Sequence, residues 1–145
     1  MVNEFQAVIA ELGGESTLRR KVRTDVELHA AIRAGFPPPV VQKVMRAGQF
    51  TLKELARSLD VSPRSLQRRR YTGRLASHES ERLYRLARIV MLAKHYIGDA
   101  DIAAQWLKEP NRALGGQIPL ELVDTEPGSR SVEQVLGRIA YGGIS

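Results

Sequence analysis

A predicted helix that begins after Ser62 carries side chains that could read DNA bases. Leu66 faces inward, which leaves four polar residues on the outer face near the start of the helix: Arg64, Ser65, Gln67 and Arg68. Arginine pairs with guanine, and glutamine with adenine, through two hydrogen bonds in the major groove. These residue types at the amino-terminal half of a short helix predict sequence-specific contacts with DNA.

Basic residues around the same helix are suited to the phosphates of a nucleic acid. Between Thr51 and Arg74 there are seven basic and two acidic residues, a local net charge of +5. We expect the helix N-terminus to hold phosphate groups together with four side chains: Lys53, Ser62, Arg69 and Arg70. The alternative is a basic helix that is only solvated.

A helix-turn-helix motif over residues 51–73 would position these side chains. Thr51 and Glu54 have the spacing of a capping box, and the helix they start has an apolar face of Leu52, Leu55, Ala56 and Leu59. Ser62 and Pro63 are typical of the N-cap and first position of a second helix. Only Asp60 and Val61 remain for the turn between the two helices. The two helices must therefore cross steeply.

Two residues depart from the usual motif. Asp60 occupies the turn position that glycine usually holds, and Arg69 stands where an apolar residue normally packs. Aspartate tolerates left-handed backbone geometry, and arginine can lay its methylene stem over apolar surface. We therefore expect the motif to form, with an unusual docking of its second helix.

Helical periodicity dominates the rest of the chain, so the expected fold is all-α. Residues 89–93 are apolar on every side, which predicts burial on more than one face of a long helix. Gly115 and Gly116 lie in an expected ordered loop. Helices are predicted over residues 3–12, 24–35, 38–47, 77–96, 99–107, 119–123 and 129–141.

Charge divides the chain into two parts. Residues 1–76 hold 14 basic and 7 acidic residues, a net charge of +7, whereas residues 77–145 hold 8 and 9, a net charge of −1. This asymmetry indicates a polyanion-binding part joined to a part with another task. We accordingly expect an N-terminal helical region at 1–76, packed on a second domain at 77–145.

Enzyme chemistry has little support in this sequence. The absence of cysteine excludes disulfides, thiol catalysis and thiolate zinc sites. No metal ligands, cofactor or catalytic residues are expected, because the histidines lack ligand spacing: His29, His78 and His95. No apolar run is long enough to cross a membrane and the start is unlike a signal peptide, so we expect a cytoplasmic protein.

From Leu75 onward the sequence resembles the C-terminal domain of the MbcA/ParS/Xre antitoxins. The pieces that carry the resemblance are Glu79-Ser80, Arg82-Leu83, Trp106-Leu107, residues 110–116, residues 119–122 and residues 135–139. Upstream, SPRSLQRRRYTGRL resembles the family's helix-turn-helix, so the resemblance covers roughly residues 35–145. It implies an antitoxin that binds and neutralises a RES-domain toxin, which attacks NAD, and that represses its own operon by binding operator DNA.

The resemblance also implies a role for the end of the chain. In family structures the antitoxin's C-terminus reaches the toxin's NAD pocket, which would place five residues there: Tyr141, Gly142, Gly143, Ile144 and Ser145. A short, small and apolar segment with a free carboxylate could enter a phosphate-binding cleft lined with arginine. A frayed tail without function is the alternative.

We expect the chain to act as a homodimer for two reasons. The apolar segment 89–93 offers surface to a partner, and helix-turn-helix proteins usually reach two half-sites about 34 Å apart. Two other functions remain open at this point. One is a free-standing transcriptional regulator whose C-terminal half only dimerises, without a toxin partner. The other is a small enzyme whose site is scattered across loops.

Overall fold

The computed structural model describes residues 3–71 and 73–140, and every regular element within them is helical. The expected all-α fold is therefore confirmed; the one isolated β-bridge in these ranges joins Asn111 to Gln117. In chain order the elements are α1 (Glu4–Glu11), α2 (Gly14–Leu18), α3 (Asp25–Ala34), α4 (Pro39–Gly48), α5 (Leu52–Leu59), α6 (Pro63–Arg69), α7 (Ser77–Ile97), α8 (Ala100–Lys108), η1 (Arg112–Leu114), α9 (Pro119–Leu122) and α10 (Glu126–Ala140). Across the described residues, no helix is both long and apolar enough to cross a membrane.

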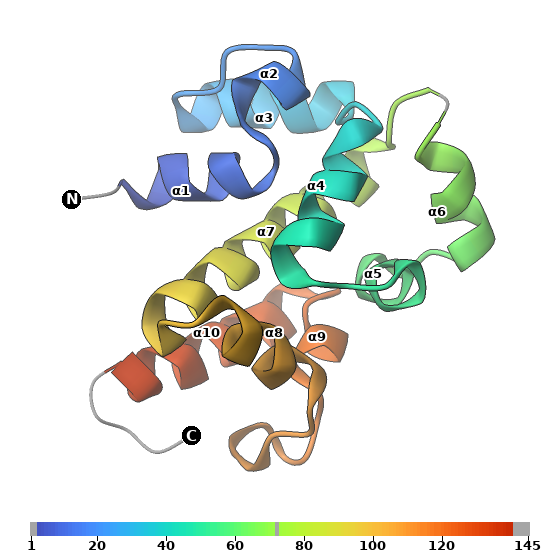
Figure 1. Cartoon of the computed structure of the whole chain (residues 1–145). Coiled ribbons are helices and arrows are strands. Elements are labelled where there is room, and N and C mark those ends of the chain that lie inside the picture. Colours follow the sequence, from blue (N-terminus) through green and yellow to red (C-terminus); the bar gives the residue numbers. More distant parts are fainter. Residues whose placement is uncertain (1–2, 72, 141–145) are drawn as a thin grey trace.

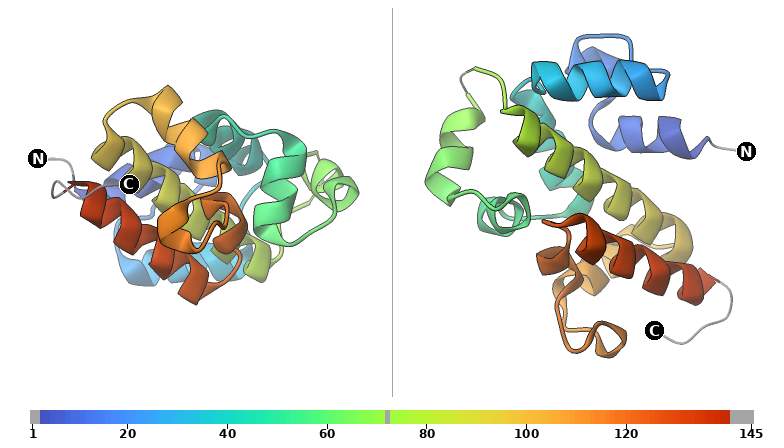
Figure 2. Two further views of the ribbon diagram at one scale, coloured as in Figure 1. Left: turned by 90° about the horizontal axis from the view of Figure 1, so that it is seen from below. Right: turned by 180° about the vertical axis from the view of Figure 1, so that it is seen from behind.

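The 21-residue helix α7 is the central element of the molecule. Helices α1, α3, α4 and α5 pack on it from the first half of the chain, and α8 and α10 from the second (Figure 1). Helix α10 runs alongside α7 in the view from behind (Figure 2). The division at residue 76 stays a prediction, and α7 contacts helices on both sides of it.

The apolar segment 89–93 of α7 is buried on several sides, as its sequence indicates. Ile89, Val90 and Ala93 are each at most 1% exposed, and Leu92 is 5% exposed. The chain's own helices provide this cover, because α7 is packed from both halves. Met91 is the half-buried member of the segment, so little of this surface is left for a second copy, and the homodimer stays a prediction.

Two helices differ from the sequence-based expectation. Residues 14–18 form α2, which periodicity missed because five residues are too few to show a repeat. Helix α10 begins at Glu126, three residues before the expected start. The cause is a local cap: the Thr125 hydroxyl accepts a hydrogen bond from the Gly128 N–H at 3.1 Å, and proline at position 127 suits a first helical turn.

The loop between α8 and α9 is ordered around one buried side chain, that of Asn111. Its Oδ1 accepts from the Ala113 N–H, and its backbone oxygen accepts from the Gly116 N–H, both at 2.9 Å. Its own N–H donates to the Gln117 oxygen, also at 2.9 Å. Asn111 thus fixes the loop at both ends and sets the 3-10 turn η1.

Candidate nucleic-acid interface

The predicted helix-turn-helix caps and turn are confirmed. Thr51 Oγ1 accepts from the Glu54 N–H at 3.1 Å, and Glu54 Oε1 accepts from the Thr51 N–H at 2.8 Å, which completes the capping box. Ser62 Oγ accepts from the N–H of Ser65 at 3.0 Å at the start of α6. Asp60 ends α5 in the left-handed region, with φ of 55°.

Burial separates the inner and outer faces of the motif. Leu55, Ala56 and Leu59 are fully buried on α5, and Leu66 of α6 is 2% exposed. The outer residues of α6 reach solvent: Arg64, Gln67 and Arg68 are exposed and Ser65 is half-buried. Lys53 is exposed in the first turn of α5.

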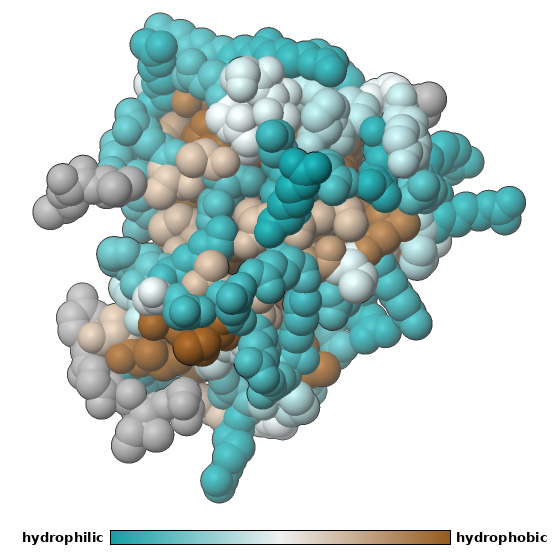
Figure 3. Space-filling view, viewed as in Figure 1, coloured by the Kyte–Doolittle hydropathy of each residue, from teal (hydrophilic) through white to brown (hydrophobic). Residues whose placement is uncertain are grey.

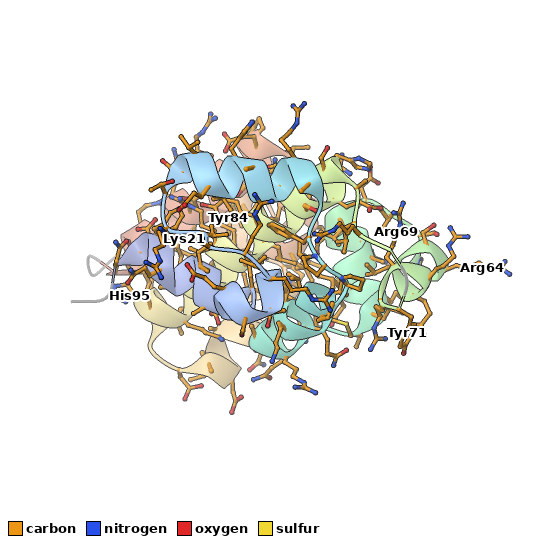
Figure 4. The ribbon with its side chains drawn as sticks, turned by 90° about the horizontal axis from the view of Figure 1, so that it is seen from above. Lys21, Arg64, Arg69, Tyr71, Tyr84 and His95 are labelled. Carbon is orange, nitrogen blue, oxygen red and sulfur yellow. The ribbon has the colours of Figure 1, made fainter. Side chains whose placement is uncertain are left out.

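The structure therefore places the predicted base-reading residues on one surface. Figure 4 shows Arg64 and Tyr71 projecting from the α6 end of the molecule, with Lys21 and His95 towards the opposite end. The predicted roles of Lys53, Ser62, Arg64, Ser65, Gln67, Arg68, Arg69 and Arg70 in DNA binding stay predictions.

Arg69 turns towards α7 rather than towards the solvent. Its Nη1 donates to the Arg74 oxygen at 3.2 Å, and its Nη2 lies 3.7 Å from Glu79 Oε2. Glu79 is 5% exposed, and its Oε1 also accepts from the Ala76 N–H at 2.8 Å, which caps α7. A buried carboxylate is therefore the reason that arginine can occupy this usually apolar position.

Arg70 turns towards α4. Its Nη2 donates to Gln42 Oε1 at 2.6 Å and its Nη1 to Gln67 Oε1 at 3.2 Å, while its guanidinium lies 5.7 Å from the centre of the Tyr71 ring. Both Arg69 and Arg70 must share or exchange these intramolecular partners when they contact a phosphate. Arg64 and Lys53 lie on the exposed outer surface, away from these intramolecular partners.

Three side chains that hold the motif in place were not assigned a role from the sequence. Arg82 Nη1 donates to the Leu59 oxygen at 3.0 Å, at the end of α5. Ser80 Oγ accepts from the Phe36 N–H at 2.8 Å, and Arg74 Nη1 donates to the Gly35 oxygen at 2.8 Å. Ser80 and Arg82 lie in the pieces that resemble the antitoxin family, which was the one available signal.

The capping carboxylate of α5 also ties the motif to α8. Burial raises the pKa of Glu54, but the Thr51 N–H and the Lys108 ammonium lower it by more, so the net pKa lies below its usual value. Lys108 Nζ lies 3.3 Å from Glu54 Oε1. The carboxylate is therefore ionised at neutral pH and joins two helices.

The exposed basic side chains of this surface, Lys53, Arg64 and Arg68, are of a type that can bind anions. Among the described residues, no group of three or more His, Asp or Glu side chains is placed to hold a metal ion. The predicted toxin-contacting residues, Tyr141, Gly142, Gly143, Ile144 and Ser145, lie outside the described residues, beyond the end of α10 at Ala140.

Two protein-family models match the chain, one on each side of the middle of α7. Residues 27–88 match the antitoxin Xre-like helix-turn-helix domain. Residues 92–142 match the antitoxin Xre/MbcA/ParS C-terminal toxin-binding domain. The resemblance stated from the sequence is therefore confirmed.

Curated relatives and a solved structure agree with these matches. The chain is 35% identical to antitoxin Xre of Photorhabdus laumondii over 81% of each chain, and 32% identical to antitoxin Xre of Yersinia enterocolitica over 79% of each. It is also 32% identical to antitoxin Xre of Pseudomonas putida, over 84% of this chain and 76% of the relative. The fold resembles a chain in the crystal structure of the M. tuberculosis MbcT-MbcA toxin-antitoxin complex, with a TM-score of 0.55, 22% identity, and coverage of 86% of this chain and 100% of that one.

Proposed function

The chain belongs to the Xre/MbcA/ParS antitoxin family, and we propose on this basis that it neutralises a RES-domain toxin by direct binding and represses its own operon. One observation carries the proposal: a single chain matches a helix-turn-helix model over residues 27–88 and a toxin-binding model over residues 92–142. The toxin class follows from the family resemblance. In this role the protein is a binding partner in the cytoplasm, not an enzyme, and needs no cofactor.

The surface of α6 supports the DNA-binding part of the proposal. It presents exposed Arg64, Gln67 and Arg68 from a capped helix, on the side away from the buried Leu66. Side chains of these types can reach base edges, while Lys53 contacts phosphate. Two copies of the chain would read two half-sites of the operator, so the proposed repressor is a homodimer.

Co-expression with the product of the adjacent gene tests the toxin-binding part. The two proteins are expected to purify together, and the complex is expected to leave NAD intact under conditions in which the isolated toxin consumes it. An adjacent product that neither binds the chain nor consumes NAD would contradict the proposal and favour a free-standing transcriptional regulator.

From the family resemblance we also propose that residues 141–145 enter the toxin's NAD pocket, and this proposal has its own test. A chain that lacks residues 142–145 keeps all of α10, so its unfolding free energy is expected to change little. If the tail fills the NAD pocket, the shortened chain still binds toxin in calorimetry but lets NAD consumption resume at saturating antitoxin. Complete inhibition by the shortened chain would instead show that the body of the domain blocks the pocket.

A further inference from the structure

An apolar stripe lies exposed on α8. Ile102 is 56% exposed, and Trp106, one helical turn later, is half-buried on the same face. Ala103, Ala104 and Leu107 form the buried face of the helix. Figure 3 shows a patch of hydrophobic surface over the end of α7 and the start of α8.

A hollow continues the stripe beyond the end of α8. It has a volume of about 240 Å³ and is lined by Trp106, Glu109, Pro110, Asn111 and Arg112. The hydrogen bonds of Asn111 fix the loop that forms one wall, so the hollow exists before any partner arrives. The indole Nε1 of Trp106 is buried and has no hydrogen-bond partner among the described residues.

Acidic side chains border this apolar surface. Asp99 and Asp101 are exposed at the start of α8, and Glu109 is exposed at its end. The basic residue of this helix, Lys108, is engaged with Glu54. Arg112, which also lines the hollow, is exposed and basic, so three acidic side chains stand against one arginine. The border is thus net negative on a chain whose net charge is +6, and its sign opposes contact with DNA phosphates.

We propose that the α8 stripe is a docking surface for the toxin. Ile102 and Trp106 form its apolar centre, and Asp99, Asp101 and Glu109 face basic residues on the toxin. A protein that binds NAD must hold two phosphate groups, which it does with cationic side chains and N–H donors. An apolar surface with an acidic border complements the basic surroundings of such a site. This inference rests on the proposed function.

Substitution of the centre tests the docking surface with a matched control. Ile102→Ser removes the exposed apolar side chain, and Val26→Ser does the same at the exposed Val26 of α3, outside the stripe. We expect Ile102→Ser to weaken toxin binding by about tenfold or more and Val26→Ser to leave it unchanged, because central apolar contacts dominate interface affinity. Both variants are expected to bind operator DNA like the wild type, which shows that they are folded.

The charge of the border has a separate readout. Asp99→Asn keeps the helix cap, because the asparagine oxygen can still accept from the Ile102 N–H. The double variant Asp99→Asn/Glu109→Gln is expected to associate with the toxin several-fold more slowly at low salt, and the salt dependence of its association rate is expected to be weaker. Trp106 is the sole tryptophan of the chain, so in protein labelled with 5-fluorotryptophan its fluorine signal is expected to shift on adding toxin and not on adding operator DNA.

The outcomes separate this inference from the proposed function. If the wild-type chain does not bind the toxin, the proposed function itself is wrong. If the wild type binds and Ile102→Ser binds equally well, the docking surface is wrong and the function stands. If Ile102→Ser converts a dimer into a monomer while toxin affinity is kept, the stripe is an interface between copies, which also overturns the inference.

Discussion

At the scale of single residues, the basic side chains of the helix-turn-helix differ in what they contact. Arg69 and Arg70 are held by Glu79, Gln42 and Gln67, whereas Arg64 and Lys53 lie exposed on the outer surface. An arginine with intramolecular partners gives up part of their energy when it binds phosphate. The outer residues are therefore expected to contribute more to DNA affinity than the two inner arginines.

Gln67→Ala is expected to cost about 1–3 kcal/mol of binding free energy for the operator and much less for a scrambled duplex, because a base-reading contact is lost. Lys53→Ala serves as the comparison. It is expected to weaken both duplexes alike and to lower the salt slope by about one, because it removes a phosphate contact. Titrations of both duplexes at several salt concentrations measure the two effects. Equal losses on both duplexes for Gln67→Ala would contradict base reading.

Gly35 is a residue that the packing of the motif requires. Its φ is +86°, and a Cβ placed there would lie 2.1 Å from the Leu75 oxygen. Gly98 has a similar φ of +88° but no atom within 4 Å of its Cβ position. Gly98→Ala is thus expected to cost only the left-handed strain, about 1–2 kcal/mol, and Gly35→Ala clearly more. Denaturant unfolding of both variants measures the two losses of unfolding free energy. Equal losses would show that the backbone at Leu75 moves away from the new Cβ without cost.

At the scale of helices, sequence reasoning succeeded where local chemistry decides the structure. The caps at Thr51, Ser62 and Asp99 and the left-handed Asp60 follow from residue type and spacing, and all four are present. It failed at α2, which is too short to show periodicity, and at the start of α10, where the cap is Thr125. The position of Glu79 at the start of a helix predicts its role in the cap, but its ion pair with Arg69 and the hydrogen bond from the Phe36 N–H to Ser80 were beyond reach, because each joins different elements of the chain.

The capping box of α5 makes a pH-dependent contribution to stability. Because the folded-state pKa of Glu54 lies below its usual value of 4.5, its ionised form stabilises the fold above that pH. The contribution is lost as the pH falls through the lower, folded-state pKa. Glu54→Gln can keep the box but loses the charge that faces Lys108. We expect this variant to be less stable than wild type at pH 7 and equal to it in strong acid. A difference that is constant with pH would contradict the assignment.

At the scale of the whole molecule, α7 unites the two halves of the chain. The helices that pack on α7 come from both the N-terminal half of the chain (α1, α3, α4 and α5) and the C-terminal half (α8 and α10). Its residues Leu83, Leu86 and Ala87 are fully buried as a result. The apolar middle of this helix gives the expected dimer little support, because sequence periodicity reports burial but not which chain provides the cover. The second reason, two operator half-sites, is independent of it.

Cooperative unfolding follows from this shared helix. The full chain is expected to unfold in one transition that is the same by far-ultraviolet and tryptophan signals. A fragment of residues 77–145 exposes the face of α7 that α1, α3, α4 and α5 cover, so it is expected to lack a sharp transition. Circular dichroism during denaturation measures both. A fragment that unfolds as sharply as the full chain would show that the C-terminal half is an independent domain.

The position of α7 also limits how such proteins can exchange parts. The helix-turn-helix match ends at residue 88 and the toxin-binding match begins at residue 92, both inside the one continuous helix of residues 77–97. A recombination event that joins the front of one relative to the back of another must cut through a buried helix instead of a linker. Chimaeras that retarget the DNA specificity of this chain should therefore replace only the outer surface of α6 and leave α7 with its native neighbours.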